Sequence, residues 1–377
     1  MPTRIPHEDI SVVLQGPVNK DTMKCINSIK NILPGAQIIL STWENTCTEF
    51  LEFDEIIYCK DPGCAYWNPP KSVALNINRW IVSSREGVKR ATRKYVLKMR
   101  TDLEIIHDRF LDYFNQYSER IQEYVLASHK LLIPSVYTTK FLGHNADNKK
   151  EITTPLHLSD WYVFGLKEDV WNFVDIPIIE DLEDFARYYE RRPYLTQQSY
   201  SWWTGYWLRK YAPEQYIGLC FAKRLFPQWE LSHFLSFDDI DLKESEKFVV
   251  SNFIILDPIE FGVVFTNEEK NSISMNISNL DVDFRYGLYS QYVYEEDYQK
   301  YCDSSFIPGK HTEDIRVAKK VPWKHRLKLT LIAILRKLSP TYNLAYRNAM
   351  RIDQLERNIV QKLMVSEREL KNEITKE

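Results

Sequence analysis

Short apolar runs alternate with amphipathic stretches over the first hundred residues, and this alternation is what most limits the possible folds. Four runs have the apolar content and length of buried strands, at 9–14, 37–42, 54–59 and 95–104. Residues 22–33 and 72–91 instead repeat apolar side chains every three or four positions, as helices do when one face is buried. Strands that alternate with helices predict an α/β fold with a mostly parallel sheet flanked by helices.

The same patterns predict the later elements. Helices are expected at 107–121, at 180–211 with a break near Pro193, from Pro213 onward, and at 286–301. Strands are expected at 124–133, at 156–165 and within 248–265. Polar residues punctuated by Gly and Pro predict a linker at 304–321.

The strand predicted at 95–104 ends in two carboxylates, Asp102 and Glu104. Alternate residues of a strand point to the same side, so both are expected to face one point beyond its carboxyl end. Open α/β sheets bind their ligands at that edge. Carboxylate oxygens there suit Mg²⁺ or Mn²⁺ and, through the metal, a diphosphate. The alternative is a strand that ends in two solvated acids, and this segment alone does not decide between them.

Composition excludes several classes of protein. With 27% charged and 44% hydrophobic residues among 377, the chain is of the soluble globular type and long enough for one large domain or two. Its 11 glycines form neither a dinucleotide-binding fingerprint nor a P-loop. The six cysteines form no CxxC pair, which favours the reducing cytoplasm over a disulfide framework or a zinc site.

Basic residues accumulate near the carboxyl end. No acidic residue lies between Asp314 and Asp353, and this interval holds ten Lys or Arg residues although the whole chain has a net charge of −3. Residues 322–338 carry Trp, Leu and Ile on one helical face, in a run too short for a bilayer span of about 20 residues. We therefore expect 322–351 to bind an anionic membrane surface rather than the protein body.

Polar side chains at the start of the second predicted helix suit an anionic ligand. Asn76 and Arg79 are three residues apart and share a helix face, with Asn78 between them. The planar guanidinium of Arg79 suits phosphate or carboxylate oxygens, although an ordinary ion pair on a polar face is the alternative. Because this helix leads into the strand that ends at Asp102, these three residues are candidates to position a ligand.

Short motifs follow one another along the chain: Gln15-Gly16-Pro17, Pro34-Gly35-Ala36, Ile39-Leu40-Ser41-Thr42-Trp43-Glu44, Lys60-Asp61-Pro62-Gly63, Asn76-Ile77-Asn78-Arg79, Lys98-Met99-Arg100-Thr101-Asp102, Ser159-Asp160-Trp161 and Pro213-Glu214-Gln215-Tyr216. In this order they resemble the WavE family of lipopolysaccharide-synthesis proteins. The resemblance covers roughly residues 9–300. It implies a GT-A-like glycosyltransferase of bacterial surface-polysaccharide assembly.

That resemblance implies transfer of a sugar from a nucleotide-sugar donor to a glycan or lipid-linked glycan acceptor, in lipopolysaccharide or capsular polysaccharide synthesis. It implies donor contacts from the motif residues Gln15, Gly16, Pro17, Glu44, Asn76, Asn78, Arg79 and Arg100. GT-A enzymes commonly carry Asp-x-Asp where this chain has Asp102-Leu103-Glu104. A metal on Asp102, with Glu104 as the second ligand, would neutralise the departing diphosphate.

Two carboxylates are candidates for the base that inverting transfer needs near the acceptor hydroxyl. Asp160 precedes Trp161, whose ring is suited to hold a sugar, although an Asp in such a place also serves as a cap. Glu214 is the second candidate, and its alternative role is to stabilise the first turn of a helix. His129 and His157 are weaker candidates, because a lone histidine is more often a packed or surface residue.

The sequence thus predicts a GT-A-like domain at 1–303, a linker at 304–321, a basic amphipathic membrane-associating segment at 322–351, and a charged helical tail at 352–377. A short heptad-like stripe in that tail fits either a homo-oligomer or a solvated helix. We expect a cytoplasmic protein attached peripherally to the inner face of the cytoplasmic membrane, with no nucleic-acid partner. Two other functions fit the same features. One is a nucleotidyltransferase or sugar-phosphate transferase of cell-envelope synthesis, and the other is a non-catalytic membrane-bound scaffold.

Overall fold

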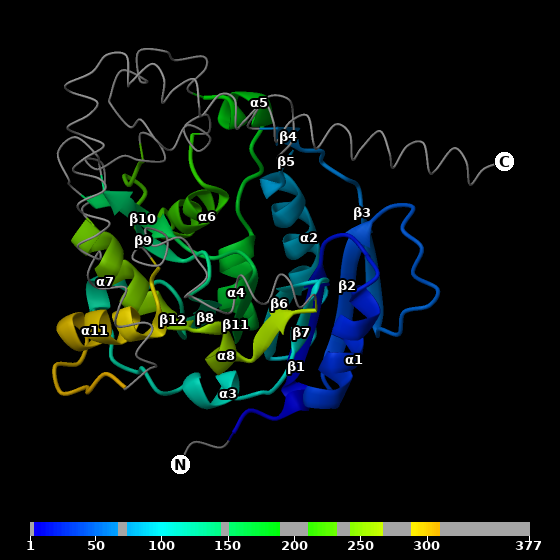
Figure 1. The fold of residues 1–377 in the computed structure, drawn as a ribbon, viewed down its shortest axis with the longest axis horizontal. Coiled ribbons are helices and arrows are strands. Elements are labelled where there is room, and N and C mark those ends of the chain that lie inside the picture. Colours follow the sequence, from blue (N-terminus) through cyan, green and yellow to red (C-terminus); the bar gives the residue numbers. More distant parts are fainter. Residues whose placement is uncertain are drawn as a thin grey trace, which may run out of the picture.

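The computed structural model describes residues 4–66, 74–144, 151–188, 210–231, 242–266 and 288–309. Its centre is a seven-stranded sheet with the order β12-β8-β11-β6-β1-β2-β3, which runs from left to right in Figure 1. The strands are β1 (Ile10–Gln15), β2 (Gln37–Trp43), β3 (Glu55–Cys59), β6 (Tyr95–Arg100), β8 (Leu131–Pro134), β11 (Tyr162–Leu166) and β12 (Phe253–Leu256). Within this sheet β11 runs against both of its neighbours, and the other pairs are parallel. The predicted α/β fold with a mostly parallel sheet is confirmed.

Helices cover both faces of the sheet. On one face lie α2 (Ile77–Arg90) and α4 (Lys167–Val174), where the rings of Trp80 and Phe173 meet edge-on at 6.3 Å. On the other face lie α3 (Phe110–Tyr113) and α8 (Pro258–Phe261), and Phe110 lies 4.9 Å from both Phe164 of β11 and Phe261 of α8. The sheet is therefore a buried central layer whose ligand-accessible parts are its edges.

Shorter elements surround this core. Three two-stranded ribbons are formed by β4 (Ala65–Tyr66) with β5 (Ala74–Leu75), β7 (Leu103–Ile105) with β13 (Val263–Phe265), and β9 (Thr139–His144) with β10 (Glu151–His157). The remaining helices are α1 (Thr22–Ile32), α5 (Leu182–Ala186), α6 (Pro213–Ala222), α7 (Leu242–Asn252) and α11 (Gln291–Tyr301), with 3-10 turns at His7–Asp9 and Gln122–Tyr124.

Two strands predicted as continuous are each divided in the structure. The run at 95–104 ends as β6 at Arg100, turns at Thr101 and Asp102, and resumes as β7, which pairs with β13 instead of the main sheet. The run at 156–165 is divided between β10 and β11 by the loop 158–161. In both cases the interruption lies at the edge of the sheet, where the backbone leaves the ladder and presents polar side chains.

Helix bounds also differ from the prediction where burial masked the pattern. The first residues of the expected strand within 248–265 belong to the end of α7. They are apolar because they are buried, and a short apolar run alone does not distinguish a buried helix from a buried strand. Within the helix expected at 107–121 the structure forms only α3. The aromatic residues after it are buried in the core, but the backbone that carries them is irregular. Helix α2 begins at Ile77, because residues 74–75 pair as β5.

Some predictions fall largely outside the described residues. The segments 322–351 and 352–377, most of the linker, and most of the helix expected at 180–211 belong to this part of the chain. All six cysteines lie among the described residues, and the structure pairs none of them in a disulfide. No helix in the described ranges is both long and apolar enough to cross a bilayer.

Candidate active site

A cavity of about 620 Å³ opens at the carboxyl edge of the central sheet. It is formed where β1, β2 and β6 end and where the loop 158–161 leads into the antiparallel strand β11, so four neighbouring strands bring side chains to one place. Open α/β sheets bind ligands at this edge, and the volume is within the usual range for a ligand pocket. The lining residues are Gln15, Gly16, Pro17, Asn19, Trp43, Asp61, Ala74, Leu75, Asn76, Ile77, Arg79, Trp80, Arg100, Thr101, Asp102, Asp160, Trp161, Pro213 and Glu214.

Most of the candidate residues predicted from the sequence line this cavity. They come from five separate segments of the chain, and the structure brings them together: Gln15, Gly16, Pro17, Asn76, Arg79, Arg100, Asp102, Asp160 and Glu214. Three candidates, Glu44, Asn78 and Glu104, do not line it. Glu44 is exposed beyond the end of β2. The Asn78 side chain donates to the carbonyl of Ile179 at 2.9 Å and accepts from its N–H at 2.8 Å. Glu104 pairs with Lys24 at 3.0 Å.

The turn after β1 depends on a glycine. Gly16 has a φ of +116°, a conformation that L side chains rarely adopt, and its N–H donates to the carbonyl of Ser41 at 3.0 Å. The next carbonyl, that of Pro17, accepts a hydrogen bond of 2.7 Å from the Thr101 hydroxyl. This contact joins the β1 turn to the turn after β6, so the two walls of the cavity are positioned together.

Arg79 is held by a carboxylate on the facing loop. Its Nε and Nη2 donate to the two carboxylate oxygens of Asp61 at 2.8 and 2.6 Å, and its Nη1 donates to Asn76 at 3.0 Å. The hydrogen bonds from Arg79 lower the pKa of Asp61. The predicted face shared by Asn76 and Arg79 is confirmed, and the guanidinium plane is fixed at the cavity wall.

Arg100 forms a second bidentate pair, with Asp102. Its Nε and Nη2 donate to the carboxylate oxygens at 2.9 and 2.7 Å. Burial opposes the charge of Arg100, but the hydrogen bonds to Asp102 and the charges of Asp102, Asp160 and Tyr137 together raise the Arg100 pKa. The guanidinium also lies over the rings of Trp161 and Phe265, at 5.6 and 5.7 Å from their centroids. Arg100 is thus held in one orientation by a carboxylate and two aromatic rings.

The described residues do not form a ready-made metal site. No group of three or more His, Cys, Asp or Glu side chains within the described ranges is arranged to hold an ion. Asp102 uses both of its oxygens for Arg100, and Glu104 belongs to β7, a different element from the strand end that carries Arg100. Asp102 therefore remains the one lining carboxylate of the predicted metal pair.

Asp160 and Glu214 line the cavity from the loop before β11 and from the first turn of α6. The carbonyl of Asp160 accepts hydrogen bonds from Lys98 Nζ at 2.6 Å and from Trp80 Nε1 at 2.7 Å, which fix the backbone at this point. Burial in the protein and the nearby charge of Glu214 raise the pKa of the Asp160 carboxyl, while Lys98 and Arg100 oppose that rise. Two like charges in one partly dry site suit proton transfer, because one member binds a proton more readily than an ordinary carboxylate.

Helix α6 carries Glu214 to the cavity and lies unusually close to β10. A Cβ atom added at Gly218 would lie 2.1 Å from the carbonyl oxygen of Leu156, so only glycine fits. Leu156 itself has a φ of +56°. His157, the next residue, places Nε2 3.9 Å from the Glu214 carboxylate. The contact between α6 and β10 therefore sets the position of Glu214.

We expect Gly218→Ala to lower the stability by about 1–3 kcal/mol, because the added methyl group must push α6 away from β10. Urea unfolding measures this effect, and Cys220→Ala on the same helix is the control. A Gly218→Ala protein as stable as the control would contradict the close approach.

Several residues that line the cavity or contact its lining were not singled out from the sequence. Trp43 and Asp61 lie within the quoted motifs, and both follow a strand, so their position at strand ends was the available signal. Lys98 stands out as a charged residue in an apolar run, which indicates a buried partner. Phe265 had no signal, because its place beside Arg100 depends on the pairing of β13 with β7, which are far apart in the sequence.

Comparison with known families decides the relationship of the chain. Residues 10–322 match the family described as WavE lipopolysaccharide synthesis. The chain belongs to this family. The resemblance noted from the motifs is confirmed, and the match spans the sheet and all of the cavity-lining segments.

Comparison with solved structures and curated proteins adds little to the WavE assignment. The apo-form glycosyltransferase GlyE of Streptococcus pneumoniae TIGR4 is 12% identical with a TM-score of 0.26, over 60% of this chain and 44% of that one. Residues 1–349 of S. aureus TarS are 13% identical with a TM-score of 0.25, over 46% of this chain and 52% of that one. The chain thus spans about half the length of these proteins. No curated protein matches it significantly.

Proposed function

We propose that this WavE protein is a glycosyltransferase, which transfers a sugar from a nucleotide-sugar donor to a glycan or lipid-linked glycan acceptor in lipopolysaccharide or capsular polysaccharide synthesis. The observation that carries the proposal is the set of groups that line one cavity. An aromatic ring (Trp43) and two guanidiniums held by carboxylates (Arg79 and Arg100) line it together with Asp160 and Glu214, and the pKa of Asp160 is raised. These groups suit a base, a diphosphate and a reacting sugar.

The carboxylate pair fixes the direction in which a donor would lie. Asp160 and Glu214 must be near the acceptor hydroxyl if one of them accepts its proton. The nucleotide then extends toward β1 and β2, with its base near Trp43 and its diphosphate between Arg79 and Arg100. Both guanidiniums are held by carboxylates, so their planes are oriented before a phosphate binds.

In this proposal Asp160 accepts the proton of the acceptor hydroxyl as the new bond to the sugar forms. Its position is maintained by Lys98 and Trp80, which hold its backbone carbonyl. Glu214 assists by its charge, which makes Asp160 a stronger base. The bond from the sugar to the diphosphate breaks, and Arg79 and Arg100 stabilise the negative charge that develops on the leaving group.

The predicted Mg²⁺ or Mn²⁺ fits this cavity by charge. Four carboxylates line it (Asp61, Asp102, Asp160 and Glu214) against two guanidiniums (Arg79 and Arg100), so a dianionic diphosphate would meet an excess of negative charge. Asp102, exchanging its bonds to Arg100, would hold the metal together with phosphate oxygens of the donor. When bound, the ion would neutralise the departing diphosphate.

Product analysis tests the function directly. Incubation with a panel of nucleotide sugars and lipopolysaccharide-derived oligosaccharide is expected to release free nucleoside diphosphate and to add one sugar to the oligosaccharide. Release of pyrophosphate or nucleoside monophosphate would identify a nucleotidyltransferase or sugar-phosphate transferase. No turnover of any donor, with glycan assembly in cells unaffected by Asp102→Ala, would sink the enzyme proposal. Parallel thermal-shift assays with nucleoside diphosphate in Mn²⁺ or EDTA test the metal.

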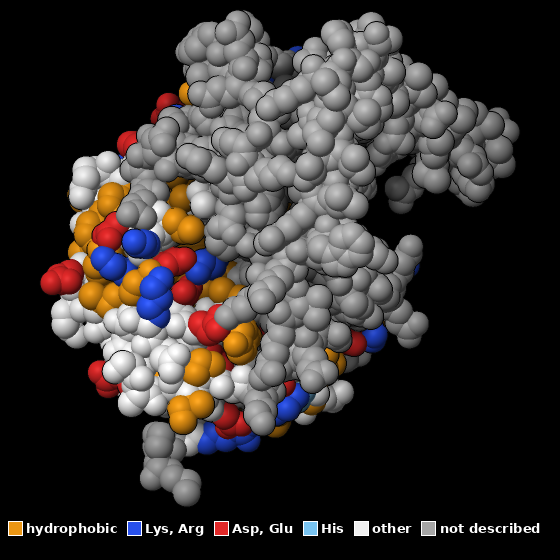
Figure 2. Space-filling model, turned by 60° about the vertical axis from the view of Figure 1, so that its left-hand side comes forward, with side chains coloured by type: hydrophobic (Ala, Val, Ile, Leu, Met, Phe, Trp, Pro, Cys, Tyr) orange, Lys and Arg blue, Asp and Glu red, His pale blue; other side chains and the backbone are white. Residues whose placement is uncertain are grey.

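Membrane attachment through 322–351 is part of the same proposal. On the described face shown in Figure 2, Lys and Arg side chains are interspersed with acidic and hydrophobic ones. The ten basic residues between Asp314 and Asp353 are the stronger source of attraction to anionic lipid, at about 1 kcal/mol for each charge near the surface.

We therefore expect the full-length protein to sediment with vesicles that contain phosphatidylserine, and not with neutral phosphatidylcholine vesicles or in about 0.5 M salt. Replacing the ten basic residues, seven of which lie within 322–351, with glutamine should abolish the binding. If the substituted protein sediments as the wild type does, the attachment does not depend on these charges.

A further inference from the structure

The loop between β8 and β9 carries an aromatic residue with a strained backbone. Tyr137 has a φ of +61°, and its side chain is 40% exposed. For a residue other than glycine this conformation costs about 1–2 kcal/mol, and it persists where the surrounding structure holds it. Such residues concentrate at functional sites.

Hydrogen bonds tie this loop to the segment that carries Asp160. The carbonyl of Tyr137 accepts a hydrogen bond of 2.9 Å from Nδ1 of His157. The N–H of Ser159 donates to the Thr138 hydroxyl at 3.1 Å, and that hydroxyl donates to the carbonyl of Pro134 at 2.6 Å. Any shift of Tyr137 would therefore disturb the backbone next to Asp160.

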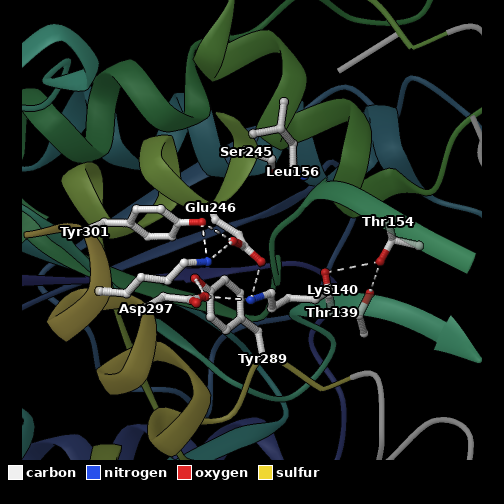
Figure 3. A network of polar contacts seen from close by, with 10 residues as sticks. Thr139, Lys140, Thr154, Leu156, Ser245, Glu246, Tyr289, Asp297 and Tyr301 are labelled. Carbon is white, nitrogen blue, oxygen red and sulfur yellow. Dashed lines mark hydrogen bonds and ion pairs between the residues drawn. The ribbon is translucent and has the colours of Figure 1, made fainter. Parts of the chain in front are cut away.

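A buried network holds the strand that follows Tyr137. Lys140 on β9 lies between Glu246 of α7 and Asp297 of α11, with N–O distances of 2.5 and 2.6 Å (Figure 3). The neighbouring Thr139 hydroxyl hydrogen-bonds that of Thr154 on β10 at 2.9 Å. Tyr137 is thus attached to a rigid support on its carboxyl side.

The ring of Tyr137 extends the aromatic wall of the cavity. It lies 4.9 Å from the ring of Trp161, which lines the cavity and contacts Phe265 at 4.7 Å. Trp161 directly follows Asp160, and Tyr137 follows β8, the strand next to β11. Tyr137 therefore lies toward β8 and β11, away from β2 and Trp43, and the ring of Trp161 contacts both Tyr137 and Arg100.

We propose that Tyr137 and Trp161 form an acceptor subsite that binds the apolar face of a pyranose ring in a glycan. The inference rests on the proposed sugar transfer and names the side from which the second substrate enters. A sugar presents C–H groups on a face and hydroxyls at its edge. Aromatic rings bind the face, while the carboxylates of Asp160 and Glu214 accept hydrogen bonds from the edge. The donor occupies the half of the cavity toward β1 and β2, so this half is left for the acceptor.

Steady-state kinetics with oligosaccharide from mild acid hydrolysis of lipopolysaccharide tests the subsite. Tyr137→Ala should raise the KM for the oligosaccharide about tenfold, as loss of one aromatic contact predicts, and leave the KM for the nucleotide sugar unchanged. Trp161→Ala should raise the KM for the oligosaccharide as much, but because Trp161 also contacts Arg100, only Tyr137→Ala separates the two substrates. Tyr137→Phe should retain the wild-type values. Tyr58→Ala is the control, since Tyr58 is 47% exposed on β3 and lies outside the cavity lining.

Tyr137→Gly separates binding from folding. Glycine accepts the positive φ, so this variant should be at least as stable as Tyr137→Ala in thermal unfolding and yet lose the same acceptor affinity. If Tyr137 is purely structural, both Tyr137 variants should keep the KM for the oligosaccharide within twofold of wild type, and this result would overturn the subsite. An equal rise of that KM in Tyr58→Ala would also overturn it, because the effect would then not be specific to Tyr137.

Saturation-transfer NMR distinguishes failure of the subsite from failure of the proposed function, because it needs no turnover. Transfer from aromatic protons to the oligosaccharide is expected in the wild type and should be lost in Trp161→Ala. If the wild type binds the oligosaccharide in this way but turns over no nucleotide sugar, only the proposed function fails. Absence of transfer in the wild type would overturn the subsite itself.

Discussion

Replacing Asp160 with asparagine is expected to lower kcat for sugar transfer by about 10²- to 10⁴-fold, the usual contribution of a positioned general base. Asparagine keeps the shape of the side chain and the backbone carbonyl that Lys98 and Trp80 hold, so the cavity should keep its form. Nucleoside diphosphate should therefore bind with unchanged affinity. Kinetics and calorimetry on the same preparation check the two expectations together.

The Asp160→Asn substitution should lower kcat without lowering the stability of the folded protein. The folded-state pKa of Asp160 is raised, chiefly by burial and then by Glu214, so above its unfolded pKa the ionised carboxylate opposes folding. The Asp160→Asn substitution would remove that cost at neutral pH, and the difference should disappear as the pH falls through the unfolded value of about 3.9. Thermal unfolding at neutral pH should thus show Asp160→Asn at least as stable as wild type. A large loss of stability would point to a structural role.

The pH dependence of kcat/KM gives a second check on the same residue. Because the base must be ionised, activity should fall below the pKa of Asp160, which burial and Glu214 raise above the ordinary value of an aspartate. Lys98 and Arg100 from β6 and Glu214 from α6 are the charges that act on this carboxyl. Glu214→Gln removes the like charge and should move the acid limb to lower pH. An acid limb that stays in place or moves upward would contradict the pairing of these two acids.

What could be predicted from the sequence follows from local pattern. The ends of β1, β2 and β6 are visible as apolar runs that stop at polar residues, and parallel strands bring such ends to one edge. This reasoning placed Asp102 at that edge, while Gln15 and Arg100 were expected there only because of the resemblance to the WavE family. The α6 start at Pro213 was likewise predicted from its sequence, and with it Glu214.

Residues whose direction is set by distant contacts could not be placed in this way. Glu104 was expected beside Asp102 because both belong to one apolar run, but pairing of Val264 with Glu104 draws this segment into a separate ribbon. The strain at Tyr137 depends on hydrogen bonds from a strand not adjacent in sequence, and no pattern within 135–138 indicates it. The burial of Asp160, which raises its pKa, is also a property of the assembled layers.

Replacing Lys140 with methionine is expected to destabilise the protein by about 3–5 kcal/mol, the cost of leaving buried carboxylates without their counter-charge. Lys140 lies between Glu246 and Asp297, and all three side chains are 9% exposed. Glu246 would keep Tyr301 and Lys300, and Asp297 would keep the hydroxyl of Tyr289 as a hydrogen-bond donor without a positive charge. Urea unfolding measures the loss, which is a large part of the 5–15 kcal/mol typical of a folded protein.

A double variant tests whether the stranded charge is the cause. Adding Asp297→Asn to Lys140→Met should recover part of the stability, because the buried carboxylate is removed together with its partner. Lys24→Met is the matched control, since Lys24 is 58% exposed in its pair with Glu104 and should cost less than about 1 kcal/mol. Additive losses in the double variant, or equal losses for Lys140→Met and Lys24→Met, would show that the network does not depend on burial of the Lys140 charge. β9 begins two residues after Tyr137. Conditions that disrupt the contacts of Lys140 should therefore raise the KM for the oligosaccharide before the central sheet unfolds.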